Sequence, residues 1–161
     1  MNTKHILLAA AGLSMACAGG PAVEIDQDPD IPATRWQGPV TTPPNLAGAV
    51  QMDGTAWMAG GDATNETRVY LEIENAAPGG THPWSVQRGR CGAGGSLFGT
   101  PDDYEPIEID DDGSAAVSTE VEMGLPRDGE YSVQVLASPT NTDLVVACAN
   151  LAPPVSRSDF N

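Results

Sequence analysis

The chain has 161 residues, of which 22 are Asp or Glu and seven are Lys or Arg, so its formal net charge is −15. Its 18 glycines and 14 prolines supply many turns and disfavour a helical bundle. The length fits one domain. The acidity excludes a generic nucleic-acid binder, because no basic stripe is present to neutralise phosphates.

The first 17 residues are typical of an export signal. Lys4 gives a positive start, and residues 6–13 form an apolar run that is too short to span a bilayer permanently. Two interpretations stay open for the small residues that follow. In a lipoprotein signal Cys17 would receive diacylglycerol and anchor the chain to a membrane, whereas ordinary secretory cleavage would follow Ala18. Both place the mature protein outside the cytoplasm, either in the bacterial envelope or secreted.

Residues 18–44 contain six prolines and three closely spaced aspartates, a composition that buries little and predicts a tether. Trp36 is the exception and is expected to dock on the domain. The domain itself is predicted over residues 45–153, and residues 154–161 are predicted to be a flexible tail.

Short segments of alternating polarity after residue 45 predict β-strands. Residues 68–74 alternate most cleanly, with Val69, Leu71 and Ile73 on one face. The other predicted strands cover residues 49–52, 55–58, 83–88, 107–109, 115–123, 130–136 and 144–149. Asp53-Gly54 and residues 110–113 are expected to be turns. This pattern predicts an all-β fold, an antiparallel β-sandwich or flattened barrel.

Three cysteines are present, and lipidation or removal of Cys17 leaves Cys91 and Cys148 as an even pair in a compartment that permits disulfides. The alternative is a metal site, but two cysteines without a nearby histidine do not complete a tetrahedral zinc shell. We therefore expect a structural disulfide.

Several segments carry a family resemblance when they are taken in chain order. They are His82–Gly92 (HPWSVQRGRCG), Tyr104–Ile107, Asp112-Gly113, Tyr131–Ser138 and Val146–Leu151. This succession resembles the copper/zinc superoxide dismutase-like domains of bacterial envelope proteins, over about residues 46–152. The resemblance implies a Greek-key β-barrel, and it implies a disulfide between the positions of Cys91 and Cys148.

The metal ligands of this family are not reproduced. Its domains present a His-x-His pair on one strand face and another copper-binding histidine at the end of a later strand; the corresponding residues here are Ser85, Gln87 and Leu136. Copper(II) in such sites favours several imidazoles, and His82 is the single histidine after the export signal. The resemblance therefore implies a degenerate site with no metal and no catalytic residue.

Other candidate residues have plainer interpretations. His82 is expected to be a loop histidine bonded to backbone. Asp102-Asp103 and residues 110–112 offer oxygen ligands for calcium, but Asp-Gly between strands is an ordinary turn. Met52 and Met58 are expected in the core rather than on copper(I).

The sequence thus predicts a non-catalytic, metal-free superoxide dismutase-like domain of an exported, lipid-anchored envelope protein. It would act as a binding or structural module without a cofactor, and its protein partner is not identified. The alternative is a superoxide dismutase or copper-handling protein with atypical ligands and copper as cofactor.

Overall fold

The computed structural model describes residues 34–154. The elements in chain order are β1 (Trp36–Thr41), the 3-10 turn η2 (Pro44–Leu46), β2 (Asp53–Gly60), β3 (Thr67–Glu74), β4 (Thr81–His82), β5 (Trp84–Arg88), η3 (Pro101–Asp103), β6 (Ile107–Glu108), β7 (Ala115–Val121), β8 (Tyr131–Ser138) and β9 (Asn141–Leu151). Within the described range, no helix is long and apolar enough to span a membrane. The predicted export signal, Cys17, residues 18–33 of the tether and residues 155–161 of the tail lie outside the described residues.

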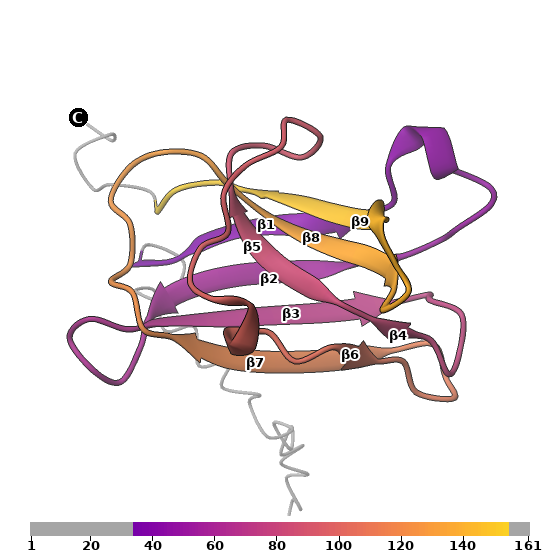
Figure 1. Ribbon diagram of the computed structural model, residues 1–161, viewed down its shortest axis with the longest axis horizontal. Helices are drawn as coiled ribbons and strands as arrows, with labels where there is room; N and C mark the ends of the chain where they lie inside the picture. The colour runs from indigo at the N-terminus through magenta and orange to yellow at the C-terminus, as the bar shows by residue number, and fades with distance from the viewer. Residues whose placement is uncertain (1–33, 155–161) are drawn as a thin grey trace, which may run out of the picture.

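Seven strands form one antiparallel sheet in the order β5-β8-β9-β1-β2-β3-β7, and β4 pairs separately with β6. The last strand, β9, lies beside the first, so the two ends of the described chain pair in the middle of the sheet. The sheet curls into a half-barrel, so that β5 passes in front of β2 and β3 (Figure 1). The predicted all-β, antiparallel fold is confirmed.

The core fills the inside of this curled sheet. Val69, Leu71 and Ile73 of β3 are completely buried, as their alternation predicted. Two aromatic residues of the long β5–β6 connection, Phe98 and Tyr104, are buried in the same cluster. Their rings meet Tyr131 and Trp84 edge-to-face, at centroid distances of 5.7 and 5.1 Å. The connection therefore contributes to the core as well as linking two strands.

The expected tether boundary at residue 44 is wrong, because β1 lies inside the sheet between β9 and β2. Trp36 is 1% exposed, and its indole Nε1 donates a hydrogen bond to the Pro126 carbonyl oxygen at 2.9 Å. Proline disfavours a central strand because it lacks an N–H donor. Pro39 is tolerated because β1 pairs with β9 only at Thr41, and Gln37 bridges Ala152, just after β9.

A second difference concerns Asp53-Gly54, which begins β2 instead of forming the predicted turn. Gly54 pairs with Ile73, and a Cβ at this position would lie 1.9 Å from the Glu72 carbonyl oxygen. Close approach of two strands, rather than a turn, therefore requires this glycine. Residues 49–52 form no strand, whereas the predicted turn at residues 110–113 is present.

We predict that Trp36→Ala lowers the free energy of unfolding by about 3–5 kcal/mol, because it leaves a large cavity in the core and an unpaired carbonyl at Pro126. Denaturant titration would measure the loss. Thr41→Ala, an exposed position on the same strand, is the matched control and should change stability by about 0.5 kcal/mol or less. Equal stability of the Trp36→Ala variant and the unchanged protein would show that β1 is dispensable.

Candidate functional site

The two positions that the resemblance aligns with a His-x-His pair, Ser85 and Gln87, lie on the outer face of β5. Trp84 and Val86 point into the core, so Ser85 and Gln87 point outward and are half-buried. The Gln87 side-chain Nε2 donates a hydrogen bond to Ser85 Oγ at 2.8 Å. The structure thus places the two residues together, as the sequence predicted, but as a hydroxyl and an amide that bind one another.

Gln134 and Ser132 of β8 lie opposite Ser85 and Gln87. Ser132 is completely buried, and its Oγ has no hydrogen-bond partner among the described residues. The Ser132 hydroxyl is therefore inaccessible to a ligand, whereas Ser85, Gln87 and Gln134 stay half-buried around it.

Leu136 also lies on β8, two residues beyond Gln134 and therefore on the same outer face. Its backbone N–H donates to the Pro83 carbonyl oxygen at 2.8 Å, and its own carbonyl oxygen lies 2.9 Å from His82 Nδ1. The structure thus brings the third position close to the strand with Ser85 and Gln87, but a leucine side chain supplies no ligand atom.

His82 is 9% exposed and lies on β4, opposite Ile107. Its contact with the Leu136 carbonyl requires a proton on Nδ1, since a carbonyl oxygen can only accept. The expected bond to the backbone is confirmed, but His82 lies on the short strand β4 and not in a loop. Its hydrogen bond links β4 to β8.

Cys91 and Cys148 form the expected disulfide, with their Cα atoms 6.0 Å apart. The Cys91 backbone N–H also donates to Asn150 Oδ1 at 2.8 Å. These two links attach the loop after β5 to the outer face of β9. The disulfide is compatible with an extracytoplasmic location.

The residues present do not fit the copper ion that the resemblance implies. The three positions offer a hydroxyl, an amide and a hydrocarbon, whereas copper(II) prefers imidazole nitrogens. Within residues 34–154, no three His, Cys, Asp or Glu side chains converge in a way that could hold a metal ion.

The candidate calcium ligands have local structural roles. Asp103 Oδ2 accepts a hydrogen bond from the Thr100 backbone N–H at 2.6 Å, in the capping box of η3. Asp112 Oδ1 accepts from the Ser114 hydroxyl at 2.7 Å and from its backbone N–H at 3.0 Å. These hydrogen bonds, the one from the Ser114 side chain foremost, lower the pKa of the Asp112 carboxyl. Met52 and Met58 are buried in the core, as expected.

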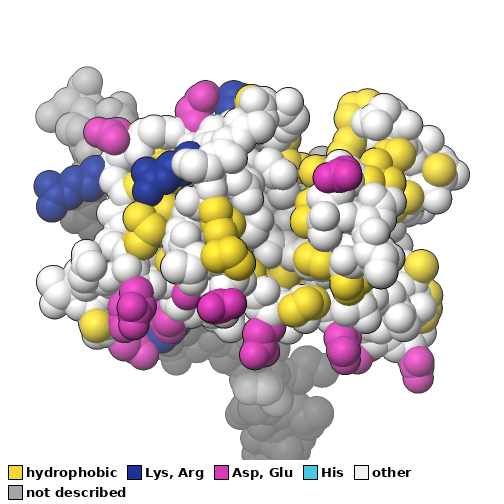
Figure 2. Space-filling model, viewed as in Figure 1, with side chains coloured by type: hydrophobic (Ala, Val, Ile, Leu, Met, Phe, Trp, Pro, Cys, Tyr) yellow, Lys and Arg dark blue, Asp and Glu magenta, His cyan; other side chains and the backbone are white. Residues whose placement is uncertain are grey.

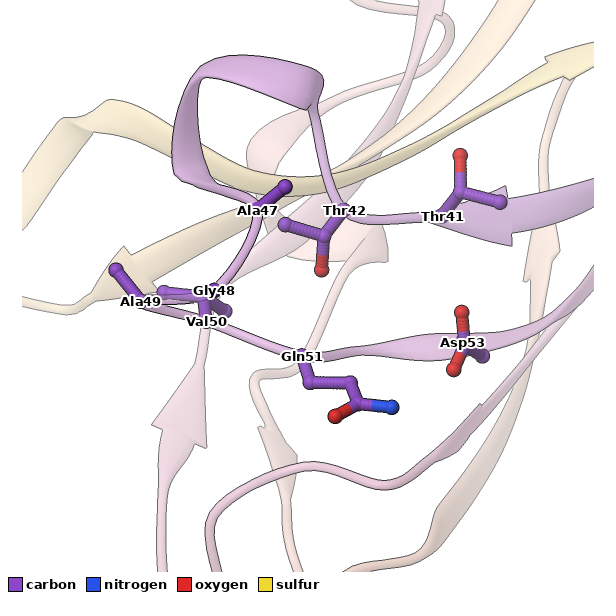
Figure 3. Close-up of a pocket in the computed structure, with 8 residues that line it drawn as sticks. All are labelled: Thr41, Thr42, Ala47, Gly48, Ala49, Val50, Gln51 and Asp53. Atoms are coloured by element: carbon purple, nitrogen blue, oxygen red, sulfur yellow. The ribbon is translucent and has the colours of Figure 1, made fainter.

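Acidic side chains dominate one edge of the surface: Figure 2 shows a row of them along the lower edge, where β7 lies in Figure 1. One hollow of about 400 Å³ is lined by Thr41, Thr42, Gln51, Asp53 and residues 47–50 (Figure 3). Apart from Gln51 its side chains are short, and Asp53 is its single carboxylate. Asn75 Nδ2 donates a hydrogen bond to Asp53 Oδ2 at 3.4 Å. Thr41 lies opposite Asp53 on the neighbouring strand, but among the described residues no hydrogen bond joins its hydroxyl to this carboxylate, so the hollow shows no activated nucleophile.

A second hollow, of about 510 Å³, lies beside Trp57 of β2 and Tyr70 of β3. The sequence-based reasoning did not identify Trp57 as a functional candidate. The signal was available in the alternation of residues 53–60 and 67–74, which directs both rings away from the core.

The comparisons with known proteins do not place the chain in a family. No family model matches it, and no curated protein does.

We predict that replacing both cysteines, in a Cys91→Ala/Cys148→Ala variant, lowers the free energy of unfolding by roughly 4 kcal/mol. The chain-entropy estimate for a loop of 57 residues gives this value. Denaturant titration of the oxidised protein and the double variant would measure it. Addition of a reductant should weaken the unchanged protein and leave the variant unaffected; equal stability of the two oxidised proteins would contradict the prediction.

Proposed function

We propose that this protein is an exported, lipid-anchored envelope protein whose β domain is a metal-free relative of copper/zinc superoxide dismutases. The domain serves as a binding module and not as an enzyme. Cys17 is the anchor position, and the lipid holds the domain at a membrane surface.

The hydrogen bond between Gln87 and Ser85 carries the non-catalytic part of this proposal. In a dismutase the two outward positions of this strand would both turn toward one copper ion. Here Gln87 and Ser85 hydrogen-bond to one another, and Leu136 on the neighbouring strand adds no ligand atom. Reversible one-electron transfer to superoxide needs a metal or another electron carrier, which these three side chains do not provide.

The relationship to the dismutase family is supported by two observations. The described residues form an all-β, antiparallel curled sheet, and the Cys91–Cys148 disulfide joins the loop after β5 to β9. In the family resemblance, the disulfide cysteines are likewise one that follows the metal-binding strand and one near the C-terminus. Fold likeness alone does not confer activity.

Restoring imidazoles tests the assignment of the three positions. A Ser85→His/Gln87→His/Leu136→His variant should bind copper(II) at least tenfold more tightly than an Ala116→His/Ser118→His variant, whose histidines have the same spacing on β7 but no third imidazole and only the Glu72 carboxylate opposite. Isothermal titration with a competing chelator would measure both affinities. Equal affinities would contradict the placement of the three positions around a common point.

The non-catalytic role is tested directly by superoxide decay. Protein incubated with copper and zinc salts and then desalted should accelerate the decay no more than a buffer control does. A metal-dependent acceleration would overturn the proposal in favour of a dismutase with atypical ligands.

The anchor is tested by metabolic labelling with a fatty acid. The unchanged protein should incorporate label into the membrane fraction, and a Cys17→Ser variant should not. Labelling that persists in the variant, or its absence from both proteins, would contradict lipidation at Cys17.

A further inference from the structure

Two aromatic rings stand on the outer face of the sheet, where core packing does not require them. Trp57 and Tyr70 are directly opposite one another on β2 and β3, and both are half-buried. Their rings are nearly parallel, at 18°, with centroids 5.2 Å apart. The guanidinium of Arg35 lies over the Trp57 ring, 5.6 Å from its centroid. The indole therefore already attracts a cation from its own chain.

The hollow of about 510 Å³ opens beside this pair, and Glu72 lines it together with both rings. Thr55 donates to one carboxylate oxygen of Glu72 at 3.3 Å. No described residue donates a hydrogen bond to the other oxygen. The hollow thus combines two aromatic rings and a carboxylate that retains acceptor capacity, and the Arg35 guanidinium, which also lines it, competes with any other cation for the indole.

We propose that this hollow binds a small cation that carries a trimethylammonium group. Such a group is weakly hydrated and donates no hydrogen bonds, so aromatic faces attract it electrostatically without needing polar partners. The Glu72 carboxylate adds an opposite charge at one side. The net charge of −15 attracts cations to the surface and disfavours anions.

This inference names the class of ligand that the proposed binding module would take. It rests on the proposed binding role, and it does not depend on the substitutions at the metal-ligand positions. Absence of trimethylammonium binding would leave the copper and superoxide results unchanged, so the two failures are distinguishable. A purely structural role for the ring pair is the competing explanation, because cross-strand aromatic pairs also stabilise sheets.

Choline and its uncharged isostere 3,3-dimethylbutan-1-ol are the probes, added to the full protein and followed by NMR. The three indole Nε1–H signals provide an internal control. Trp36 and Trp84 are buried, and their Nε1–H groups donate to the carbonyl oxygens of Pro126 and Glu105. Choline should shift the Trp57 signal in a saturable manner and leave the other two in place, and the uncharged isostere should shift none. Equal shifts from both probes, or no shift from choline, would overturn the proposal.

Three variants separate ligand binding from sheet stability. Glu72→Gln keeps the shape of the side chain and should weaken choline binding about tenfold. Glu74→Gln changes an exposed residue on the same strand that does not line the hollow, and should leave the affinity unchanged. Arg35→Ala removes a like charge and an internal competitor for the indole, and should bind choline no more weakly than the unchanged protein. Unchanged affinity in Glu72→Gln, or loss of binding in Arg35→Ala, would overturn the proposal.

Discussion

A single inward face, formed where one seven-stranded sheet curls on itself, carries the apolar burial on which this domain depends. Because side chains alternate along each strand, every inward position fixes the outward position of its neighbours. Trp84 and Val86 must fill the core, so Ser85 and Gln87 must face outward. The positions open to function are therefore set by the core, and the identity of the residues there decides what chemistry is possible.

The two outer faces that result differ in character. Near β5 and β8, small polar side chains bond to one another or are buried, and the disulfide attaches the adjoining loop to β9. Near β2 and β3, two large rings remain half-exposed beside a hollow and a carboxylate. The first surface presents a hydroxyl, amides and a leucine side chain, which do not form a set of copper(II) ligands. The second offers contact area and a charge, which makes it the better place for a ligand.

Features that follow from local sequence patterns were predictable, whereas features that depend on contacts between distant segments were not. The strict alternation in residues 68–74 identified β3 and its buried face, and the even pair of cysteines predicted the disulfide. Pro39 argued against a strand at β1, because nothing in the local sequence shows that this strand pairs with β9 only at Thr41 and bridges Ala152 through Gln37. Gly54 suggested a turn, but a glycine is required there because the Glu72 backbone of the neighbouring strand leaves no room for a Cβ atom. The stacking of Trp57 on Tyr70 depends on register and was equally hidden.

The central claim is that the outer face of β5 and β8 does not hold copper. Native mass spectrometry of the protein purified from copper-supplemented cells tests it most directly, because it counts metal ions per intact chain without assuming an activity. The account predicts the mass of the metal-free, disulfide-bonded chain as the dominant species. One copper ion bound per chain, retained through exchange into volatile buffer and lost in a Ser85→Ala/Gln87→Ala variant, would contradict it.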